Sequence, residues 1–329
     1  MLWPALEKLL SEAVATESPP LRQLLDPVLA GGKGLRPTLV RICARFGPHD
    51  PAEVDRVAAA IELVHLASLI HDDILDGATV RRHRPALHSL YGPIPAVLAG
   101  DYLFATAFSL LARSPLAVLN IVTATIRTMC EGEIEQRMAP GISEEAYLSH
   151  IGKKTASLIS AACRCGGVLG RLKRSGQEGL ARFGWHLGLA YQMADDLLDL
   201  LGRSEEMGKP RLQDLSQGII TLPVLRFLEL ASQAGYWREK ISRGLTPEER
   251  EEIAAAVHSS GCCGYAGERA REQIDFAFSA LESLPPCPAR EELVRLAGEV
   301  LAKIEGLNYP RPPQEGTEEK EVAGRQATL

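Results

Sequence analysis

We expect no membrane-spanning helix, because we find no apolar run as long as the roughly 20 residues that such a helix needs. Its first residues, Met1-Leu-Trp-Pro-Ala-Leu-Glu-Lys8, also lack the basic region and long apolar core of a signal peptide. We therefore expect a cytoplasmic protein without a transmembrane segment.

An excess of positive charge is missing too, because 36 lysines and arginines stand against 42 aspartates and glutamates, for a formal net charge of -6. This balance argues against a general nucleic-acid binder, although local basic clusters can still hold a phosphate-bearing small molecule. The seven cysteines are an odd number, and the pairs at 163/165 and 262/263 lack the histidine or cysteine partners of a zinc site. We expect buried free thiols.

Alternating runs of Val, Ile and Thr are few, and apolar residues recur at three- and four-residue intervals, which predicts an all-α fold. No segment is long and flexible enough to be an interdomain linker, so we expect one helical domain over residues 1–309 and a disordered polar tail over 310–329. The expected helices cover about residues 3–15, 20–30, 36–46, 51–76, 94–112, 115–138, 144–172, 176–201, 211–216, 220–232, 234–242, 247–258, 262–283 and 288–305.

Three aspartates, Asp72, Asp73 and Asp76, close a nearly continuous apolar segment that begins at residue 57. On a helix, Asp72 and Asp76 lie one turn apart on one face, with Asp73 beside them. Such carboxylates repel one another unless a cation lies between them, and oxygen-only ligands favour a hard ion such as Mg²⁺. Three arginines that suit bidentate phosphate contacts follow at once: Arg81, Arg82 and Arg84.

The same spacing returns at Asp195, Asp196 and Asp199, again after apolar sequence, with Gln192 one turn earlier on the same stripe. A single triplet of this kind is more often a solvated acidic helix end. Two copies, each after a helix that reads as buried on most faces, favour a paired site for a polyanion and its metal ions.

A glycine-rich segment, Gly31-Gly-Lys-Gly-Leu-Arg-Pro37, places Lys33 and Arg36 where a helix begins, which is a common anion-binding arrangement. The glycine spacing is not that of a nucleotide P-loop, and alone it is weak evidence. Further polar motifs follow downstream: Lys153-Lys-Thr155, Gly208-Lys209 and the segment from Asp214 to Pro223.

Taken in order, these motifs resemble the trans-polyprenyl diphosphate synthase family, from about residue 28 to about residue 305. The matching elements are Gly-Gly-Lys-x-x-Arg-Pro, His-Asp-Asp-x-x-Asp followed by Arg-Arg, Gly-Asp-Tyr-Leu at 100–103, Lys-Thr at 154–155, Gln-x-x-Asp-Asp-x-x-Asp, and Gly-Lys at 208–209. The resemblance implies antiparallel helices around a deep central cavity, usually in a dimer, with both aspartate clusters at its mouth. Such enzymes join isopentenyl diphosphate head-to-tail onto an allylic prenyl diphosphate.

The resemblance also implies roles for individual residues. Mg²⁺, as three ions once diphosphate is bound, would be held by Asp72, Asp73, Asp76, Asp195, Asp196 and Asp199. The allylic diphosphate would contact Arg81, Lys154, Thr155, Gln192 and Lys209, and the isopentenyl diphosphate would contact Lys33, Arg36, His65 and Arg82. Without the resemblance, His65 would read as a core histidine. The released diphosphate would accept the final proton. One departure is Ile219, where family members often carry a lysine.

Chain length is expected to depend on the helix before Asp72, because an allylic tail would run back along it. The positions four, five, eight and eleven residues earlier are Ser68, Ala67, Val64 and Ile61. The first two are small, where short-chain members tend to carry aromatic rings, so we expect an open tunnel and a hexaprenyl to octaprenyl product. Phe104 and Phe108 would form its floor, although two aromatics at helical spacing are more often ordinary core.

Several alternatives stay open at this stage. The chain could be a shorter-chain geranylgeranyl or farnesyl diphosphate synthase, or the catalytic subunit of a two-component synthase, in which case a small regulatory subunit would replace the second copy of a homodimer. A terpene cyclase would leave Lys33, Arg36 and Arg82 without a purpose. A structural helical protein would release no diphosphate in the presence of Mg²⁺.

Overall fold

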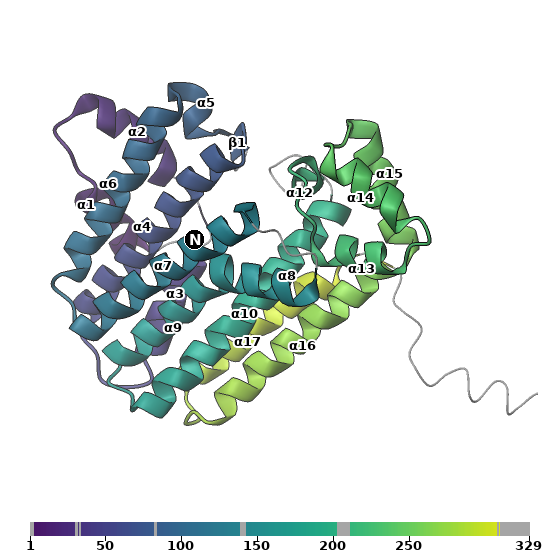
Figure 1. Ribbon diagram of the computed structural model, residues 1–329. Helices are drawn as coiled ribbons and strands as arrows, with labels where there is room; N and C mark the ends of the chain where they lie inside the picture. The colour runs from purple at the N-terminus through teal and green to yellow at the C-terminus, as the bar shows by residue number, and fades with distance from the viewer. Residues whose placement is uncertain are drawn as a thin grey trace, which may run out of the picture.

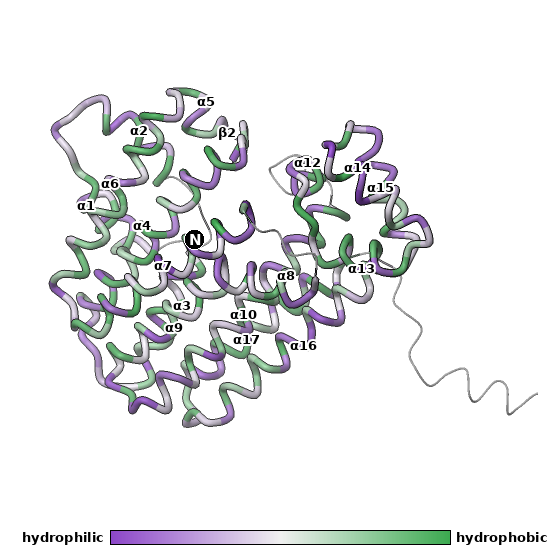
Figure 2. The backbone as a smooth tube through the Cα atoms, viewed as in Figure 1, coloured by the Kyte–Doolittle hydropathy of each residue, from purple (hydrophilic) through white to green (hydrophobic). Residues whose placement is uncertain are grey.

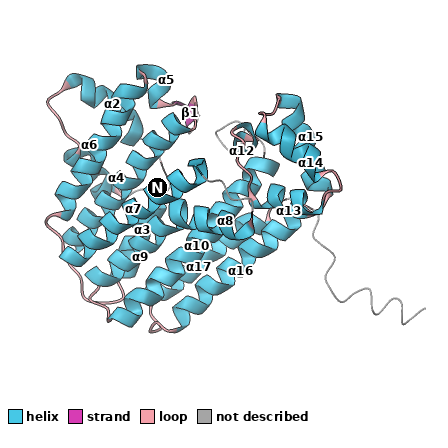
Figure 3. Ribbon diagram, viewed as in Figure 1, coloured by secondary structure: helices cyan, strands magenta, loops and turns pink. Residues whose placement is uncertain are grey.

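The computed structural model describes residues 3–29, 32, 34–81, 84–138, 143–202, 211–307 and 309. They form helices and one short hairpin (Figures 1 and 3), so the predicted all-α fold is confirmed. The elements are α1 (Pro4–Ala13), α2 (Pro19–Leu29), α3 (Leu35–Ala44), α4 (Pro51–Leu75), β1 (Val80–Arg81), β2 (Arg84–Pro85), α5 (Leu87–Tyr91), α6 (Pro93–Leu111), α7 (Leu116–Met138), α8 (Glu144–Ile151), the π-helix η1 (Gly152–Ala156), α9 (Ser157–Leu169), α10 (Arg174–Leu201), α12 (Gln213–Ser216), α13 (Leu222–Leu230), α14 (Ala234–Ser242), α15 (Pro247–Ser259), α16 (Cys262–Glu282) and α17 (Pro288–Glu305).

Two long helices, α4 and α10, form the centre of the bundle. Helix α4 packs against α3 and α6, and α10 packs against α9 and α16 (Figure 1). Helix α4 begins at Pro51 after Asp50, whose carboxylate accepts the Ala52 amide at 3.0 Å. Every residue from 57 to 64 of α4 is buried, because this stretch is apolar on nearly all sides. The helix therefore holds the carboxylates at its C-terminal end in a fixed position.

Two glycines let the helices that carry the polar motifs approach closely. A Cβ on Gly132 of α7 would lie 2.6 Å from the Lys153 Cβ, and one on Gly188 of α10 would lie 2.5 Å from the Ala156 Cα. No side chain fits at either distance, so only glycine permits α7 and α10 to pack this tightly against η1. The predicted single helix over 144–172 is interrupted there by the π-helical turn.

Helix α6 corrects one expectation, because by length and composition it could cross a membrane. Only a third of its most apolar stretch is buried, and Ile94, Val97, Leu98 and Phe108 are 73%, 40%, 60% and 37% exposed. Figure 2 shows the hydropathy of each residue along this and the other helices. The sequence did not predict an apolar helix of this length, because Gly100 and Asp101 interrupt the apolar run although the segment as a whole stays apolar. A single such helix is weak evidence for a membrane span, since core helices of soluble proteins meet the same criteria.

Candidate active site

A cavity of about 1860 Å³ opens between α4 and α10, with walls that also include parts of α3, α7, α8, η1, α12 and α14. It is bordered by Asp72 of α4, by Asp76 just after the last residue of that helix, and by Asp195 and Asp196 of α10. The fold thus brings together two carboxylate groups that are more than a hundred residues apart in the sequence. Part of the wall of this cavity is apolar, formed by Leu69, Met129 and Leu158.

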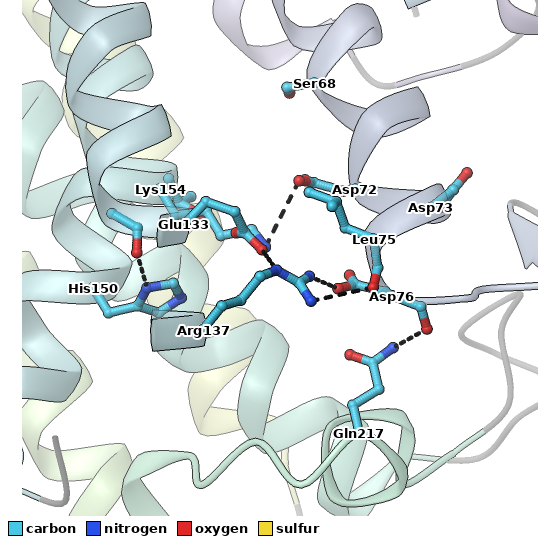
Figure 4. Close-up of polar contacts among 12 residues, drawn as sticks. Ser68, Asp72, Asp73, Leu75, Asp76, Glu133, Arg137, His150, Lys154 and Gln217 are labelled. Carbon is cyan, nitrogen blue, oxygen red and sulfur yellow. Dashed lines mark hydrogen bonds and ion pairs between the residues drawn. The ribbon is translucent and has the colours of Figure 1, made fainter. Parts of the chain in front are cut away.

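The first cluster divides between two sides of α4. Asp72 and Asp76 face the large cavity, whereas Asp73 turns away from them (Figure 4). The Asp73 side chain is 8% exposed and accepts the Arg81 Nε at 2.8 Å, next to a smaller cavity of about 290 Å³ lined by α2 and α5. Burial raises the pKa of Asp73, and the Arg81 guanidinium opposes that shift. The hairpin of β1 and β2, which the sequence did not predict, positions this arginine.

Helix α7 contributes two charged residues opposite the first cluster. Glu133 pairs with Lys154 at 2.7 Å and accepts Arg137 Nε at 2.6 Å, and Arg137 Nη2 donates to Asp76 at 2.7 Å (Figure 4). Lys154 also lies 3.8 Å from Asp72. Acidic and basic side chains therefore alternate across this wall of the cavity.

Burial and neighbouring charges together set the ionisation of these residues. It raises the pKa of Asp72 to about 6, helped by the charges of Glu133 and Asp76 and opposed by Lys154. Burial alone would also raise the pKa of Glu133, but Lys154 and Arg137 outweigh it and lower that pKa. The pKa of Lys154 is raised, because Asp72 and Glu133 outweigh the effect of its burial. Glu133 and Lys154 therefore stay charged at neutral pH.

A chain of hydrogen bonds connects η1 to the second cluster. The Thr155 hydroxyl donates to the Gln192 carbonyl oxygen at 2.7 Å, and the Gln192 amide donates to Asp196 at 2.8 Å. The hydroxyl of the buried Tyr147 donates to the other Asp196 oxygen at 2.6 Å. Burial raises the pKa of Asp196 to about 6, against the effect of these two donors. Thr155 and Gln192, which the sequence singled out in two separate motifs, are therefore in direct contact.

The other two aspartates of the second cluster differ from Asp196. Asp195 is paired with Lys303 of α17 at 2.9 Å, and that ammonium also lies 5.3 Å from the centre of the Tyr191 ring. Asp199 is buried and accepts the backbone amides of Gln213 and Asp214 at 3.2 and 3.1 Å, so it holds the start of α12. Asp199 is not among the residues that border the large cavity.

The residues expected to hold the isopentenyl diphosphate are described in part. Arg36, in the first turn of α3, and His65, seven residues before Asp72 on the same face of α4, both border the large cavity. Ile219 borders it as well. Lys33, Arg82 and Lys209 lie outside the described residues, as does the segment 310–329.

Of the four α4 positions expected to set chain length, one borders the large cavity and three lie in the hydrophobic core. Ser68 borders the large cavity, and its hydroxyl folds back to the His65 carbonyl at 2.8 Å. Ala67, Val64 and Ile61 are fully buried and are not among the residues that border the cavity. Phe104 packs on the His71 ring, with 5.8 Å between centroids, and Phe108 is 37% exposed on the outer face of α6.

The carboxylates suit a metal that shares its ligands with substrate. Within the described ranges, no three acidic, histidine or cysteine side chains converge as a ready-made metal site. Mg²⁺ typically takes one or two carboxylates and completes its shell with phosphate oxygens and water. The partly buried, mutually repelling carboxylates of Asp72 and Asp76 fit that requirement.

Four polar residues of this region were not predicted: Glu133, Arg137, Tyr147 and Lys303. Glu133 and Arg137 stand four residues apart, which on a helix indicates an ion pair but says nothing of a third partner. The contacts of Tyr147 and Lys303 join residues 49 and 108 positions apart, and no local pattern announces them.

Comparison with known proteins gives a consistent result. A family model described as Polyprenyl synthetase matches residues 18–259. The chain is 40% identical over 306 residues to heptaprenyl diphosphate synthase component 2 of Geobacillus stearothermophilus, covering 89% of this chain and 93% of that one. It is 35% identical over 276 residues to octaprenyl diphosphate synthase of Escherichia coli, covering 82% and 85%.

Solved structures agree with the sequence comparisons. A polyprenyl synthase from Caulobacter crescentus, complexed with calcium and isoprenyl diphosphate, matches with a TM-score of 0.86 and 33% identity, covering 91% of this chain and 93% of that one. A decaprenyl diphosphate synthase from Rhodobacter capsulatus matches with a TM-score of 0.84 and 34% identity, covering 91% and 95%.

Proposed function

The chain belongs to the polyprenyl synthetase family and is a trans-prenyltransferase, and from that premise we propose that it extends an allylic diphosphate to a hexaprenyl to octaprenyl diphosphate. The observation that carries the proposal is a single cavity bordered by both carboxylate clusters and by Lys154, Arg36 and His65. Carboxylates for metal ions and cations for two diphosphates are what head-to-tail condensation requires.

The first step is loss of the allylic diphosphate, which takes the negative charge as the C–O bond breaks. Mg²⁺, on which the family generally depends, would stabilise that charge as a Lewis acid. Asp72, Asp76 and Asp195 are the carboxylates we propose to hold it, with Asp73, Asp196 and Asp199 behind them. Lys154 stays charged at neutral pH, because Asp72 and Glu133 raise its pKa against the effect of burial, and we propose that it binds the departing oxygens.

The second step joins the allylic cation to the double bond of isopentenyl diphosphate. Arg36 and His65, with Lys33 and Arg82, are proposed to bind this second diphosphate. The Thr155 and Gln192 oxygens, which are joined by a 2.7 Å hydrogen bond, are proposed to direct their dipoles toward the cation. The released diphosphate then accepts the proton lost from the product. Arg81 and Lys209 are proposed to complete the allylic clamp, although Arg81 also pairs with Asp73.

We propose that Ser68 keeps the tail end of the cavity open. A phenylalanine there would project from α4 into the space that the growing chain must pass. Ser68→Phe should therefore shorten the main product by one or more prenyl units, as measured by chromatography of the dephosphorylated products. Ser259→Phe, an exposed serine on α15, is the control. An unchanged product from Ser68→Phe would remove Ser68 from this role and turn attention to Phe104 and Phe108.

A second candidate is the catalytic subunit of a two-component synthase. The 40% identity to a protein named component 2 favours it. Under this proposal the chain binds both prenyl substrates but needs a small partner subunit for full turnover. A homodimer remains the first proposal, with the exposed apolar face of α6 as its contact surface. We further propose one domain over residues 1–309 and a cytoplasmic location.

The deciding experiment supplies the purified chain alone with Mg²⁺, isopentenyl diphosphate and farnesyl or geranylgeranyl diphosphate, and then sizes the product. Elongation to 30–40 carbons, roughly six to eight prenyl units, is the expected result. Asp195→Asn is the matched inactive control. Diphosphate binding without turnover would favour the two-component enzyme, and absence of both would contradict the proposal.

A further inference from the structure

Arg137 borders the large cavity, yet none of the steps above uses it. It lies in the last turn of α7 and is 40% exposed. Its guanidinium reaches across to the end of α4, where it meets Asp76 and the backbone of Leu75 (Figure 4). A cation therefore already occupies a carboxylate that is proposed to bind metal.

The three nitrogens of this guanidinium have different partners. Nε donates to Glu133 at 2.6 Å, Nη1 to the Leu75 carbonyl at 3.2 Å and Nη2 to Asp76 at 2.7 Å. Glu133 is 14% exposed and one helical turn from Arg137, so this contact lies within α7 and does not depend on α4. The two terminal nitrogens, in contrast, are held only by groups at the cavity mouth.

Glu133 is shared between two cations. One of its oxygens holds Arg137, and the other holds Lys154 at 2.7 Å. The single carboxylate therefore sets an ammonium and a guanidinium side by side on the wall that faces Asp72 and Asp76. On the opposite side, the Gln217 amide donates to the Asp76 carbonyl at 3.3 Å, and Ile219, two residues later, brings no charge to the cavity.

A divalent ion at Asp76 would change the partners of Arg137. Asp76 would give its oxygens to the ion, whose charge would repel the guanidinium at short range, while Glu133 would keep Nε in place. Nη1 and Nη2 are then free to turn, and a planar pair of N–H donors matches two phosphate oxygens. Resting on the proposed function, we infer that Arg137 covers Asp76 in the metal-free enzyme and passes to the allylic diphosphate when metal binds, supplying the cation absent at Ile219.

The test removes the charge and keeps the stem, as Arg137→Met. Calorimetry with inorganic diphosphate and Mg²⁺ should show affinity lowered roughly 10-fold or more, the effect of losing a charge-assisted contact. The KM for farnesyl diphosphate should rise by a similar factor, and the KM for isopentenyl diphosphate should stay within about twofold. Arg127→Met, an exposed arginine on the same helix that does not border the cavity, should change neither. Arg137→Lys should lose less than Arg137→Met.

Two further measurements separate this inference from its alternatives. Binding of Mn²⁺ without diphosphate, followed by electron paramagnetic resonance, should be as tight in Arg137→Met as in wild type, or tighter, because a competing cation is gone. Ile219→Lys added to Arg137→Met should restore most of the diphosphate affinity. Weaker Mn²⁺ binding, or unchanged diphosphate affinity, in Arg137→Met would overturn the inference. A wild-type chain that binds diphosphate through Arg137 but never elongates would contradict only the proposed function.

Discussion

Asp72 is the residue at which burial and neighbouring charge oppose ionisation together. Its carboxylate faces Asp76 on its own helix and Glu133 across the cavity, with Lys154 as the nearest compensating charge. A pKa of about 6 means that the metal-free protein holds this group ionised at neutral pH at a cost in stability. That cost keeps an ionised carboxylate in place for the proposed metal ion.

Replacing that carboxylate should therefore stabilise the metal-free fold. Asp72 has its pKa raised from 3.8 to about 6, so the folded protein binds this proton more tightly than the unfolded chain and loses stability as pH rises through that window. Asp72→Asn should raise the free energy of unfolding at pH 7.5 by up to about 3 kcal/mol, and should have little effect below about pH 4. Denaturant unfolding in EDTA at both pH values measures it.

The matched control is Asp55→Asn, at a half-buried residue near the start of α4 and far along the helix from the cavity. A stability gain that persists unchanged at low pH would show that ionisation of Asp72 is not the cause. Turnover should be lost in Asp72→Asn at every pH, since the proposed metal ligand is gone.

For single residues, the sequence predicted which aspartates share a helix face better than it predicted which partners their side chains contact. Four residues of helix put Asp72 and Asp76 on one face, as expected. The pairing of Asp73 with Arg81 depends on a hairpin whose two-residue strands are too short to predict. The contacts of Asp199 with the start of α12 join residues 14 and 15 positions apart. Such partners are fixed by tertiary packing, which no local pattern contains.

Among the elements, the π-helical turn η1 has the greatest effect on the site. It carries Lys154 and Thr155, and it packs closely between Gly132 of α7 and Gly188 of α10. Gly188 stands one turn before Gln192, so the tight contact at Ala156 brings Gln192 within reach of Thr155. π-helical turns occur often at functional sites because they redirect side chains within a helix.

A methyl group at Gly188 should displace this turn. Its Cβ would meet the Ala156 Cα at 2.5 Å and Cβ at 2.8 Å, and both lie on η1 rather than on a flexible side-chain end. Gly188→Ala should lower turnover at least 10-fold and cost about 1–3 kcal/mol of stability through overpacking. Steady-state assays and thermal unfolding measure the two effects.

Gly298→Ala on α17 is the matched control, because nothing lies within 4 Å of its new Cβ. There the substitution should stabilise the protein slightly, by up to about 1 kcal/mol from helix propensity. Equal behaviour of the two variants would mean that the close contact at Ala156 has no part in placing the site.

The sequence predicted most helices to within a few residues, since their apolar period and capping residues are local signals. It missed α5, the hairpin and the π-helical turn. Apolar periodicity cannot detect one extra residue in a turn when the helices on both sides continue the same pattern.

The outer face of α6 leaves apolar side chains exposed that no other part of the described chain covers. Ile94 and Leu98, one turn apart, are 73% and 60% exposed. A contiguous exposed apolar surface of this kind typically marks a contact with another protein. The wrong expectation about apolar length concerned this same helix, so the segment that resembles a membrane span is also the proposed dimer contact.

A charge on that face should prevent association. Leu98→Glu would place an unpaired carboxylate in an apolar interface, which is costly to bury. Sedimentation velocity at micromolar concentration should show a dimer for wild type and a monomer for Leu98→Glu. Phe276→Glu, at an exposed aromatic on α16, should remain dimeric. A monomeric wild type would contradict the homodimer and favour the small partner subunit.

The contact of Lys303 with Asp195 also bears on the order in which the protein matures during synthesis. A ribosome makes both aspartate clusters long before α17, and Lys303 follows Asp195 by 108 residues. Until α17 emerges and docks, Asp195 lacks this counter-charge and the Tyr191 ring lacks the ammonium beside it. The ion pair at Asp195 therefore forms among the last steps of folding, so the second aspartate cluster reaches its described contacts only when nearly all of the chain has been translated.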